Sequence, residues 1–433
     1  MLSFFKIFKG WNTIDEPSNG TLSGKNFFAL WSSLGVGLLV LSTGSFLIDF
    51  GYTNSILAVI IGSAVGSFLL ALAGKIGSDN KIPSITSVNP TFGKIGVIIP
   101  AFFNIIQLIG WTTFEIMIMS KVIETISDNY IPNYISSVII GIIIIIFGMI
   151  GPIRVIKRFI GQFVIWIVYT TSIILLVHVL INTNIQIFDI SKIDMNFFGA
   201  FDIVIVMPIS WLPLVADYNR FAKKSKTAFF GTFIGFTITN SILFAVGLLF
   251  GISEITELIL SIQMIFFGLI LLILLLDDID NAYADAYSAS ISTLSIFPKL
   301  EQKHLIIGII ILSTYLSIAI PIVQYEIFLI LIGAIFIPLF AVVIADYYLV
   351  DKEKYKIENI NNSKLKIGRA AILSWILGLI VYYLFSPISP IYVQIDYSIG
   401  SVIPSFLIAF GTYLVIQKIK RQEKEDKSFV YKS

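Results

Sequence analysis

Long apolar segments recur along almost the whole chain and constrain its fold more than any other feature of the sequence. A helix needs about 20 mostly apolar residues to cross the hydrocarbon core of a bilayer. Twelve segments approach or exceed this length: 27–49, 53–74, 97–121, 133–152, 158–182, 197–216, 227–251, 260–293, 304–323, 326–349, 370–387 and 398–417. Only 13% of the 433 residues are charged and the mean hydropathy is +0.92, far outside the range of soluble domains. We therefore predict an all-α polytopic membrane protein forming one transmembrane domain over residues 1–433.

The distribution of lysine and arginine supports twelve spans with both termini in the cytoplasm. Cytoplasmic loops of membrane proteins carry an excess of these residues. When the N-terminus is placed inside, only Lys121 and Lys192 fall on the outer side. We expect a plasma-membrane protein whose residues 1–26 and 418–433 are cytoplasmic tails. The start of the chain also lacks a signal-peptide pattern.

The segment LLILLLDDIDNAYADAYSAS at 271–290 places several carboxylates in an apolar span. On a helix Asp277, Asp280 or Asn281, and Asp285 share one face. Each ionised carboxylate in a bilayer costs about 2.5–3.5 kcal/mol on insertion scales. These acids therefore indicate a functional site or a water-filled path.

Two spans contain helix-breaking residues. The first carries Gly35, Gly37, Thr43 and Gly44, which weaken its helix, and the sixth has Pro208 and Pro213 around Ser210 and Trp211. Interrupted helices at matching positions of two halves are typical of inverted-repeat transporters, where freed backbone groups bind substrate and ion. The alternative is that the glycines permit close packing and the prolines only bend a helix.

In the third span Gln107, Trp111 and Glu115 follow one another at four-residue intervals on one helix face. An aromatic plane beside hydrogen-bonding side chains suits a flat heteroaromatic ligand. The alternative is that Trp111 packs between helices and a polar neighbour satisfies Glu115.

The sixth span offers a second aromatic wall in Trp211, with Ser210 supplying polar contacts. A lone tryptophan can equally be an interfacial anchor. Beyond it, Asp217 and Arg220 are interpreted as a helix-end pair near the cytoplasmic surface, and a gating role is the alternative.

Several function classes lack support in the sequence. His178 and His304 lie in different spans, cysteine is absent, and no phosphate-binding loop or catalytic triad is visible. The basic residues are explained by topology, so nucleic-acid binding is not needed. We expect no cofactor and no metal beyond a coupling ion.

Three stretches resemble the nucleobase:cation symporter-1 family: NPTFGKIG (89–96) with the IIQLIGW that follows, MPISWLPLVADYNRF (207–221) and IPLFAVVIADYYLVDK (337–352). The last ends on the Asp-Tyr pair of Asp346 and Tyr347. Within the family, SWLPLVADY and ADAYSAS are most similar to hydroxymethylpyrimidine permeases and then to cytosine permeases.

The resemblance implies a LeuT-like fold with two inverted five-helix repeats, at 27–182 and 197–349, and two extra helices within 370–417. It implies import of a pyrimidine-type nucleobase or a thiamine-precursor heterocycle, such as hydroxymethylpyrimidine or cytosine, by alternating access. The coupling ion would be Na⁺ or H⁺, and the partners are this small substrate and the lipid bilayer. The oligomeric state is left open.

The resemblance also suggests roles for individual residues. It implies that Trp111 stacks on the ring and Glu115 pairs with its edge. The remaining substrate candidates are Gln107, Ser210, Trp211, Gly37, Asp280 and Asn281. The coupling-ion candidates are Asp277, Asp278, Gly35 and Leu38.

Two departures from the family pattern leave open whether Na⁺ or H⁺ is the coupling ion. The first helix has Val40 where related permeases tend to have an acid, and Asp277 and Asp278 stand where serine and threonine help bind Na⁺. Carboxylates ligate Na⁺ but also carry protons, and we expect at least one to be protonated in part of the cycle. Asp285 is expected to be a gate or a structural acid.

The competing interpretation is an intramembrane enzyme that uses Asp277, Asp280 and Glu115 for acid–base or metal chemistry. The interrupted helices have no purpose in such an enzyme. A channel is the third alternative, and nothing in the sequence resembles a pore loop.

Overall fold

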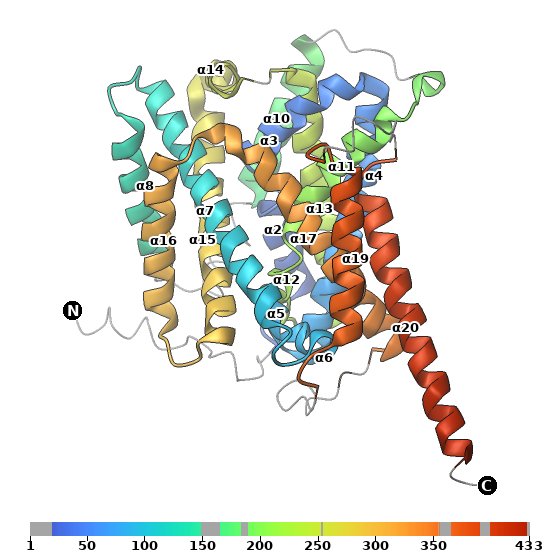
Figure 1. Ribbon diagram of the computed structural model, residues 1–433. Coiled ribbons are helices and arrows are strands. Elements are labelled where there is room, and N and C mark those ends of the chain that lie inside the picture. The colour runs from blue at the N-terminus through green and yellow to red at the C-terminus, as the bar shows by residue number, and fades with distance from the viewer. Residues whose placement is uncertain are drawn as a thin grey trace.

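Long helices run side by side through the molecule, and short helices cap its two ends (Figure 1). The computed structural model describes residues 20–148, 165–182, 189–252, 254–353, 355, 365–389 and 399–430. Its longer helices are α2(Gly24–Ser33), α3(Leu38–Ser45), α4(Tyr52–Asn80), α7(Ile98–Ile126), α8(Asn133–Gly148), α10(Ile165–Asn182), α11(Asn196–Ser210), α13(Ser225–Phe250), α14(Ile255–Gln263), α15(Leu269–Ile296), α16(Gln302–Ala319), α17(Tyr325–Ala345), α19(Arg369–Phe385) and α20(Val402–Val430). The short ones used below are η2(Phe46–Phe50), α5(Ser84–Ser87), α6(Asn89–Phe92), η4(Ile190–Lys192), α12(Val215–Asn219), η5(Ile265–Gly268) and the π-helical turn η7(Asp346–Val350). The described residues form no extended sheet, so the all-α prediction is confirmed.

Helices occupy each of the twelve predicted positions. Within the described residues, seven are long and apolar enough to cross a membrane: α4, α7, α10, α13, α16, α17 with η7, and α20. The pair α2 and α3 qualifies together as an eighth span, bent by 57°, while α8, α11 and α19 are shorter apolar helices. α15 is 28 residues long but carries four aspartates. The total of twelve spans stays a prediction.

The first interruption separates α2 from α3 at residues 34–37. At Gly35 a Cβ atom would lie only 2.4 Å from Thr239 Oγ1 on α13, so a side chain here would force Thr239 or the helices to shift. Gly37 is extended, with φ 170° and ψ 154°, which takes the backbone out of the helix. The predicted break in the first span is confirmed at Gly35 and Gly37, whereas Thr43 and Gly44 lie within α3.

The second interruption separates α11 from α12. α11 runs through Pro208 and ends at Ser210, and residues 211–214 form turns before α12 begins. Pro213 lacks the N–H that a continuing helix would need. Pro208 packs closely on α4, where a Cβ on Gly66 would lie 2.3 Å from its Cγ. The predicted break in the sixth span is also confirmed.

Some element boundaries differ from the sequence prediction. The segment 260–293 is not one span, because Gly268 adopts a left-handed conformation (φ +78°) and separates α14 and η5 from α15. Residues 24–26 belong to α2, and residues 418–430 continue α20 beyond the bundle (Figure 1). The ends of the fourth and fifth predicted spans (149–152 and 158–164) and the tail residues 1–19 and 431–433 lie outside the described residues.

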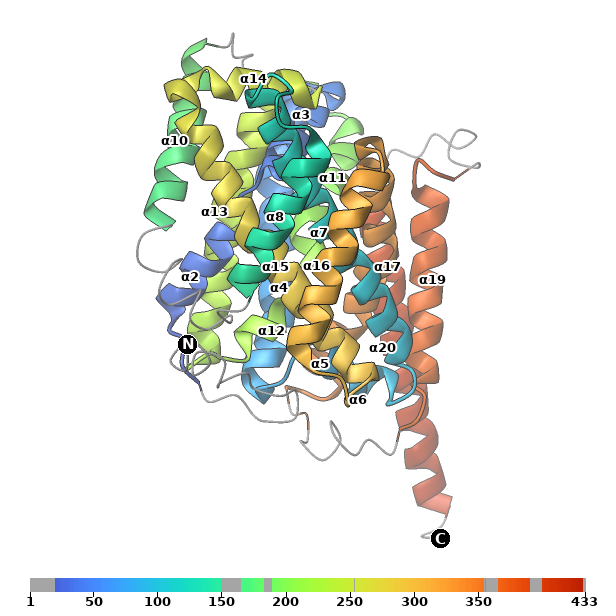
Figure 2. The same ribbon diagram turned by 90° about the vertical axis from the view of Figure 1, so that its left-hand side faces the viewer.

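The helices form two groups around the interruptions. α7, α8, α15 and α16 pack against one another on one side, and α17, α19 and α20 pack together on the other (Figures 1 and 2). α13 packs on α2, α3 and α4, and α11 packs on α4. Both interruptions therefore lie in the interior, where their unpaired backbone groups need protein partners.

Candidate functional site

The first interruption is held by the acidic face of α15. Ser33 Oγ donates to Asp277 Oδ1 at 2.8 Å and more weakly to Asp280 Oδ2 at 3.4 Å. The backbone N–H of Leu38, at the start of α3, donates to Asp278 Oδ1 at 3.3 Å. A carboxylate is favoured there because a helix N-terminus carries a partial positive charge. The predicted ion-site residues Asp277, Asp278 and Leu38 therefore do come together.

Asn281, on the next turn of α15, also hydrogen-bonds the backbone of the first interruption. Its Nδ2 donates to the carbonyl oxygen of Val36 at 2.8 Å, a group freed by the interruption. A Cβ on Gly37 would meet Asp278 Oδ1 at 3.0 Å and Asn281 Nδ2 at 3.4 Å, so Gly37 also lies against the polar face of α15. Gly35 lies elsewhere: a Cβ atom on it would meet Thr239 of α13 and not α15.

Five carboxyl groups gather in this region with little solvent. Asp277, Asp278, Asp280 and Asp285 of α15 and Glu115 of α7 are each at most 6% exposed. Glu115 lies within electrostatic range of all four of these aspartates. The ion pairs of the described residues involve Lys75, Lys121, Lys303 and His304, and none includes one of these carboxylates. Buried like charges of this density require bound cations or protons.

The predicted face of α7 meets the second interruption. Gln107 Nε2 donates to the carbonyl oxygen of Ser210 at 3.1 Å and to Asn104 Oδ1 at 2.9 Å. Asn104 Nδ2 in turn donates to Ser292 Oγ of α15 at 2.8 Å and to the carbonyl oxygen of Pro213 at 3.3 Å. Sequence reasoning missed Asn104, although its spacing of three residues before Gln107 places it on the same helix face.

The two predicted tryptophans lie in different aromatic groups. The Trp111 ring packs edge-on against Tyr325 and Phe328 of α17, with centroids 5.9 and 5.5 Å away. The Trp211 ring packs edge-on against Trp31 of α2 at 5.9 Å. Among the ring contacts of the described residues, none joins Trp111 to Trp211. The sequence analysis missed Trp31 and Tyr325, which the fold brings from distant spans.

Asp217 and Arg220 are buried rather than solvated at a helix end. Each is 1% exposed. Asp217 Oδ1 accepts from the backbone N–H of Ser84 on α5 at 2.9 Å, and Arg220 Nη2 donates to Tyr287 OH of α15 at 3.2 Å. Tyr218 OH also donates to the carbonyl oxygen of Ala284 at 3.2 Å. The short helix α12 is thus attached to both α5 and α15, next to the turn that carries Asp285.

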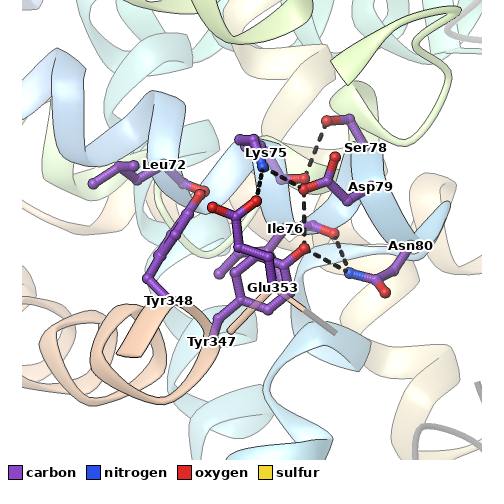
Figure 3. A network of polar contacts seen from close by, with 9 residues as sticks. All are labelled: Leu72, Lys75, Ile76, Ser78, Asp79, Asn80, Tyr347, Tyr348 and Glu353. Carbon is purple, nitrogen blue, oxygen red and sulfur yellow. Dashed lines mark hydrogen bonds and ion pairs between the residues drawn. The ribbon is translucent and has the colours of Figure 1, made fainter. Parts of the chain in front are cut away.

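A polar network joins α4 to the turn η7 that ends α17 (Figure 3). Lys75 forms ion pairs of 2.7 Å with Asp79 and Glu353, and Tyr347 OH donates to Asp79 Oδ2 at 2.9 Å. Tyr348 OH donates to the carbonyl oxygen of Leu72, also in α4, at 2.9 Å. The Asp-Tyr ending noted in the sequence therefore ties the tenth predicted span to the second.

Asp346, the acid of that ending, is a buried acceptor. It receives hydrogen bonds from Tyr413 OH of α20 at 2.6 Å, Thr91 Oγ1 of α6 at 2.7 Å and Tyr355 OH at 3.3 Å. These bonds hold the end of α17 against α20 and the loop before α7, so Asp346 has a clear structural role.

Two interrupted helices whose backbones are held by facing helices define the class of this protein. It is a multi-pass membrane transporter with a LeuT-like fold. The family model described as "Permease for cytosine/purines, uracil, thiamine, allantoin" matches residues 14–395. The chain belongs to this family, the nucleobase:cation symporter-1 family, as the sequence resemblance predicted. Its members are transporters, which removes the intramembrane-enzyme alternative.

Known proteins extend this comparison over nearly the whole chain. The putative purine-cytosine permease YxlA of Bacillus subtilis (strain 168) is 23% identical over 458 residues, with 95% of this chain and 96% of YxlA covered. Inward-facing Mhp1 is 16% identical with a TM-score of 0.72, covering 95% of this chain and 96% of Mhp1. Closed Mhp1 with bromovinylhydantoin bound is 15% identical with a TM-score of 0.73, covering 94% and 96%. MhsT in complex with L-phenylalanine is 14% identical with a TM-score of 0.58, covering 93% and 99%. These structural likenesses confirm the predicted fold class.

Proposed function

We propose that this nucleobase:cation symporter imports a pyrimidine-type nucleobase or a thiamine-precursor heterocycle, such as cytosine or hydroxymethylpyrimidine. The observation that carries the proposal is the contact between the acidic face of α15 and the interrupted first helix, beside the face of α7 that holds Trp111 and Glu115. The family description includes cytosine and thiamine, and the YxlA name includes cytosine. A bound hydantoin in Mhp1 shows that this fold accepts a flat nitrogen heterocycle in a relative.

In this proposal Trp111 stacks on the heterocycle and Glu115 hydrogen-bonds its edge. Stacking on a rigid indole gives affinity, and a few polar groups give orientation. Trp211 supplies a second aromatic surface from the other interruption. The remaining substrate contacts are assigned to Gln107, Ser210, Gly37, Asp280 and Asn281.

The coupling ion is assigned to Asp277 and Asp278, with Leu38 and Gly35 in the adjoining backbone. Because one oxygen of each carboxylate has no hydrogen-bond partner among the described residues, each has capacity to bind an ion. Hard cations favour such oxygen ligands, while a carboxylate can equally accept a proton. Either ion would link α15 to the first interruption and stabilise one state of the alternating-access cycle. Asp285, Asp217 and Arg220 lie toward the α5 end of α15 and are assigned to the gate on that side.

The proposal includes the topology predicted from the charges. Both termini lie in the cytoplasm of the cell that carries the protein in its plasma membrane. The two repeats span residues 27–182 and 197–349, and the helices of 370–417 are additions to them.

Uptake of radiolabelled cytosine and hydroxymethylpyrimidine into proteoliposomes tests the proposal. We expect saturable uptake that an inward Na⁺ gradient or an inward proton gradient accelerates, and Asp277→Asn should abolish that acceleration. Asp49→Asn is the matched control because Asp49 is exposed at the end of η2. Uptake that neither gradient affects, or an Asp277→Asn variant with unchanged ion dependence, would contradict the coupling assignment. Absence of saturable uptake of either heterocycle would contradict the substrate assignment.

A further inference from the structure

We infer that this site selects heterocycles by their hydrogen-bond donors, favouring an amino edge and rejecting the matched oxo compound. The inference rests on the proposed function and narrows its substrate class. Within the pyrimidines it means amino-substituted rings rather than diketo rings. Two side-chain amides, one at each helix interruption, carry the argument.

The amide of Gln107 can adopt only one orientation. Its partner at 3.1 Å is the carbonyl oxygen of Ser210, which can only accept, so the NH₂ group must face it. The second hydrogen of this NH₂ group is donated to Asn104 Oδ1 at 2.9 Å. The Asn104 amide is oriented in turn by the carbonyl oxygen of Pro213, which accepts from Asn104 Nδ2.

These carbonyl groups are available because the helix is interrupted there. In a continuous helix each would accept from the N–H four residues ahead. Instead the N–H groups of Leu214 and Val215 donate to the carbonyl of Trp211, and that of Asp217 donates to Leu214. Ser210 and Pro213 thus keep free carbonyl oxygens that bind the amides of α7.

The consequence is that Gln107 offers only its oxygen to a ligand. Gln107 is 3% exposed, and its Oε1 has no hydrogen-bond partner among the described residues. Trp111 and Glu115 follow it on the same face of α7, each with a buried polar atom that is likewise unpartnered there. The unpaired Oε1 of Gln107 is an acceptor whatever the pH.

Asn281 repeats this arrangement at the first interruption. Its Nδ2 is oriented by the carbonyl oxygen of Val36 at 2.8 Å, and its Oδ1 is buried without a partner in the described part of the chain. Glu115, Asp277 and Asp278 each also have one buried carboxyl oxygen without a hydrogen-bond partner among the described residues. Trp111 Nε1 is the donor on the α7 face. The carboxyl oxygens can carry a proton or hold a cation, whereas the amide oxygens Gln107 Oε1 and Asn281 Oδ1 can only accept. Each interruption therefore presents one fixed acceptor to a ligand.

These two fixed acceptors discriminate between ligands of the same shape. An amino group donates two hydrogens and matches these acceptors. The matched oxo ring has a carbonyl oxygen in place of the amino group, which places acceptor against acceptor. Its hydrogen lies instead on the neighbouring ring nitrogen, so it offers fewer donors, and none at that position. Sites built to bond a ligand N–H or O–H reject analogues that lack it by large factors. We expect at least a tenfold preference for the amino member of a matched pair.

Binding to the purified full-length protein and inhibition of labelled cytosine uptake test the inference together. The ligand pairs are cytosine with uracil, and 2-aminopyrimidine with 2-hydroxypyrimidine. We expect the amino member to bind and inhibit at least tenfold more strongly. Equal strength, or a preference for the oxo member, overturns the inference while the proposed transport of a heterocycle stands. If no heterocycle binds or is taken up, the proposed function fails and this inference fails with it.

Variants locate the source of the preference. Gln107→Met keeps the side-chain length but removes the acceptor, and should reduce the cytosine-to-uracil ratio severalfold. Asn104→Leu should reduce it too, because Asn104 positions the Gln107 amide. The matched control is Gln302→Met, since Gln302 bonds Ser290 Oγ near the end of α15, outside the site. A ratio unchanged in both Gln107→Met and Asn104→Leu would contradict the assigned source, and the ligand pairs on the unaltered protein test the preference independently of folding.

Discussion

Two substitutions of Asp278 separate its structural role from its proposed role in ion coupling. Asp278 Oδ1 accepts from the Leu38 N–H at the start of α3. Asp278→Asn keeps an acceptor oxygen there but removes the negative charge. Asp278→Ala removes both and leaves a buried N–H without its partner.

We expect Asp278→Ala to reduce mainly stability and Asp278→Asn to reduce mainly the affinity for the coupling ion. Losing a buried hydrogen bond to a charged group costs about 1.5–3 kcal/mol, so Asp278→Ala should lower the stability of the purified protein by this amount. Asp278→Asn should lose less stability. A cation about 4 Å from a carboxylate gains about 4 kcal/mol at an effective dielectric constant of 20, before desolvation. We therefore expect Asp278→Asn to raise the half-saturating concentration of the coupling ion between tenfold and roughly a thousandfold.

The assay is initial uptake of cytosine into proteoliposomes, measured across Na⁺ concentrations at fixed pH and across pH without Na⁺. Thermal unfolding in detergent gives the stability of each variant. The ion whose dependence changes in Asp278→Asn is the coupling ion. If Asp278→Asn keeps the ion dependence of the unaltered protein while Asp278→Ala is destabilised, Asp278 is only a cap of α3 and the reasoning is refuted.

Three further predictions address other parts of the molecule. Trp111→Leu should raise the KM for uptake at least tenfold, whereas Trp166→Leu, on a residue 71% exposed on α10, should leave it unchanged in the same transport assay. Asp202→Ala should lower the unfolding free energy by about 2–4 kcal/mol, because Asp202 accepts three hydrogen bonds at the start of α20. The ion dependence of transport should not change. Unchanged thermal unfolding would contradict this prediction. In the loop at η4, hydrogen bonds from Ser191 lower the pKa of Asp189. Because the pKa is depressed in the folded state, these hydrogen bonds stabilise the protein above the ordinary pKa of aspartate, and the stabilisation is lost as the pH falls through the folded pKa. Ser191→Ala should raise the pKa of Asp189 in a carboxyl NMR titration. An unchanged pKa would argue against the hydrogen bonds from Ser191.

Many features of this protein could be predicted from local sequence because they depend on local physics. The bilayer sets the length of each span, so apolar runs located the helices. The glycines of the first span, and Pro208 with Pro213, pointed to both interrupted helices. Gly37 and Pro213 act on their own backbone, whereas Gly35 allows the close approach of α13. Helical periodicity also placed Gln107, Trp111 and Glu115 on one face of α7. The roles of these residues stay predictions.

The tertiary structure alone decided which groups meet. No local pattern indicates that the carbonyl of Val36 orients Asn281, 245 residues later in the chain. The same is true of the pairing of Trp31 with Trp211, and of the burial of Arg220 against Tyr287. Such contacts depend on how separate helices pack, and an amide turns to match whichever carbonyl an interrupted helix has left free. The acidic residues of the site can be read from the sequence. Which amide atoms face a ligand as acceptors is decided only when α7 and α15 pack against the two interruptions.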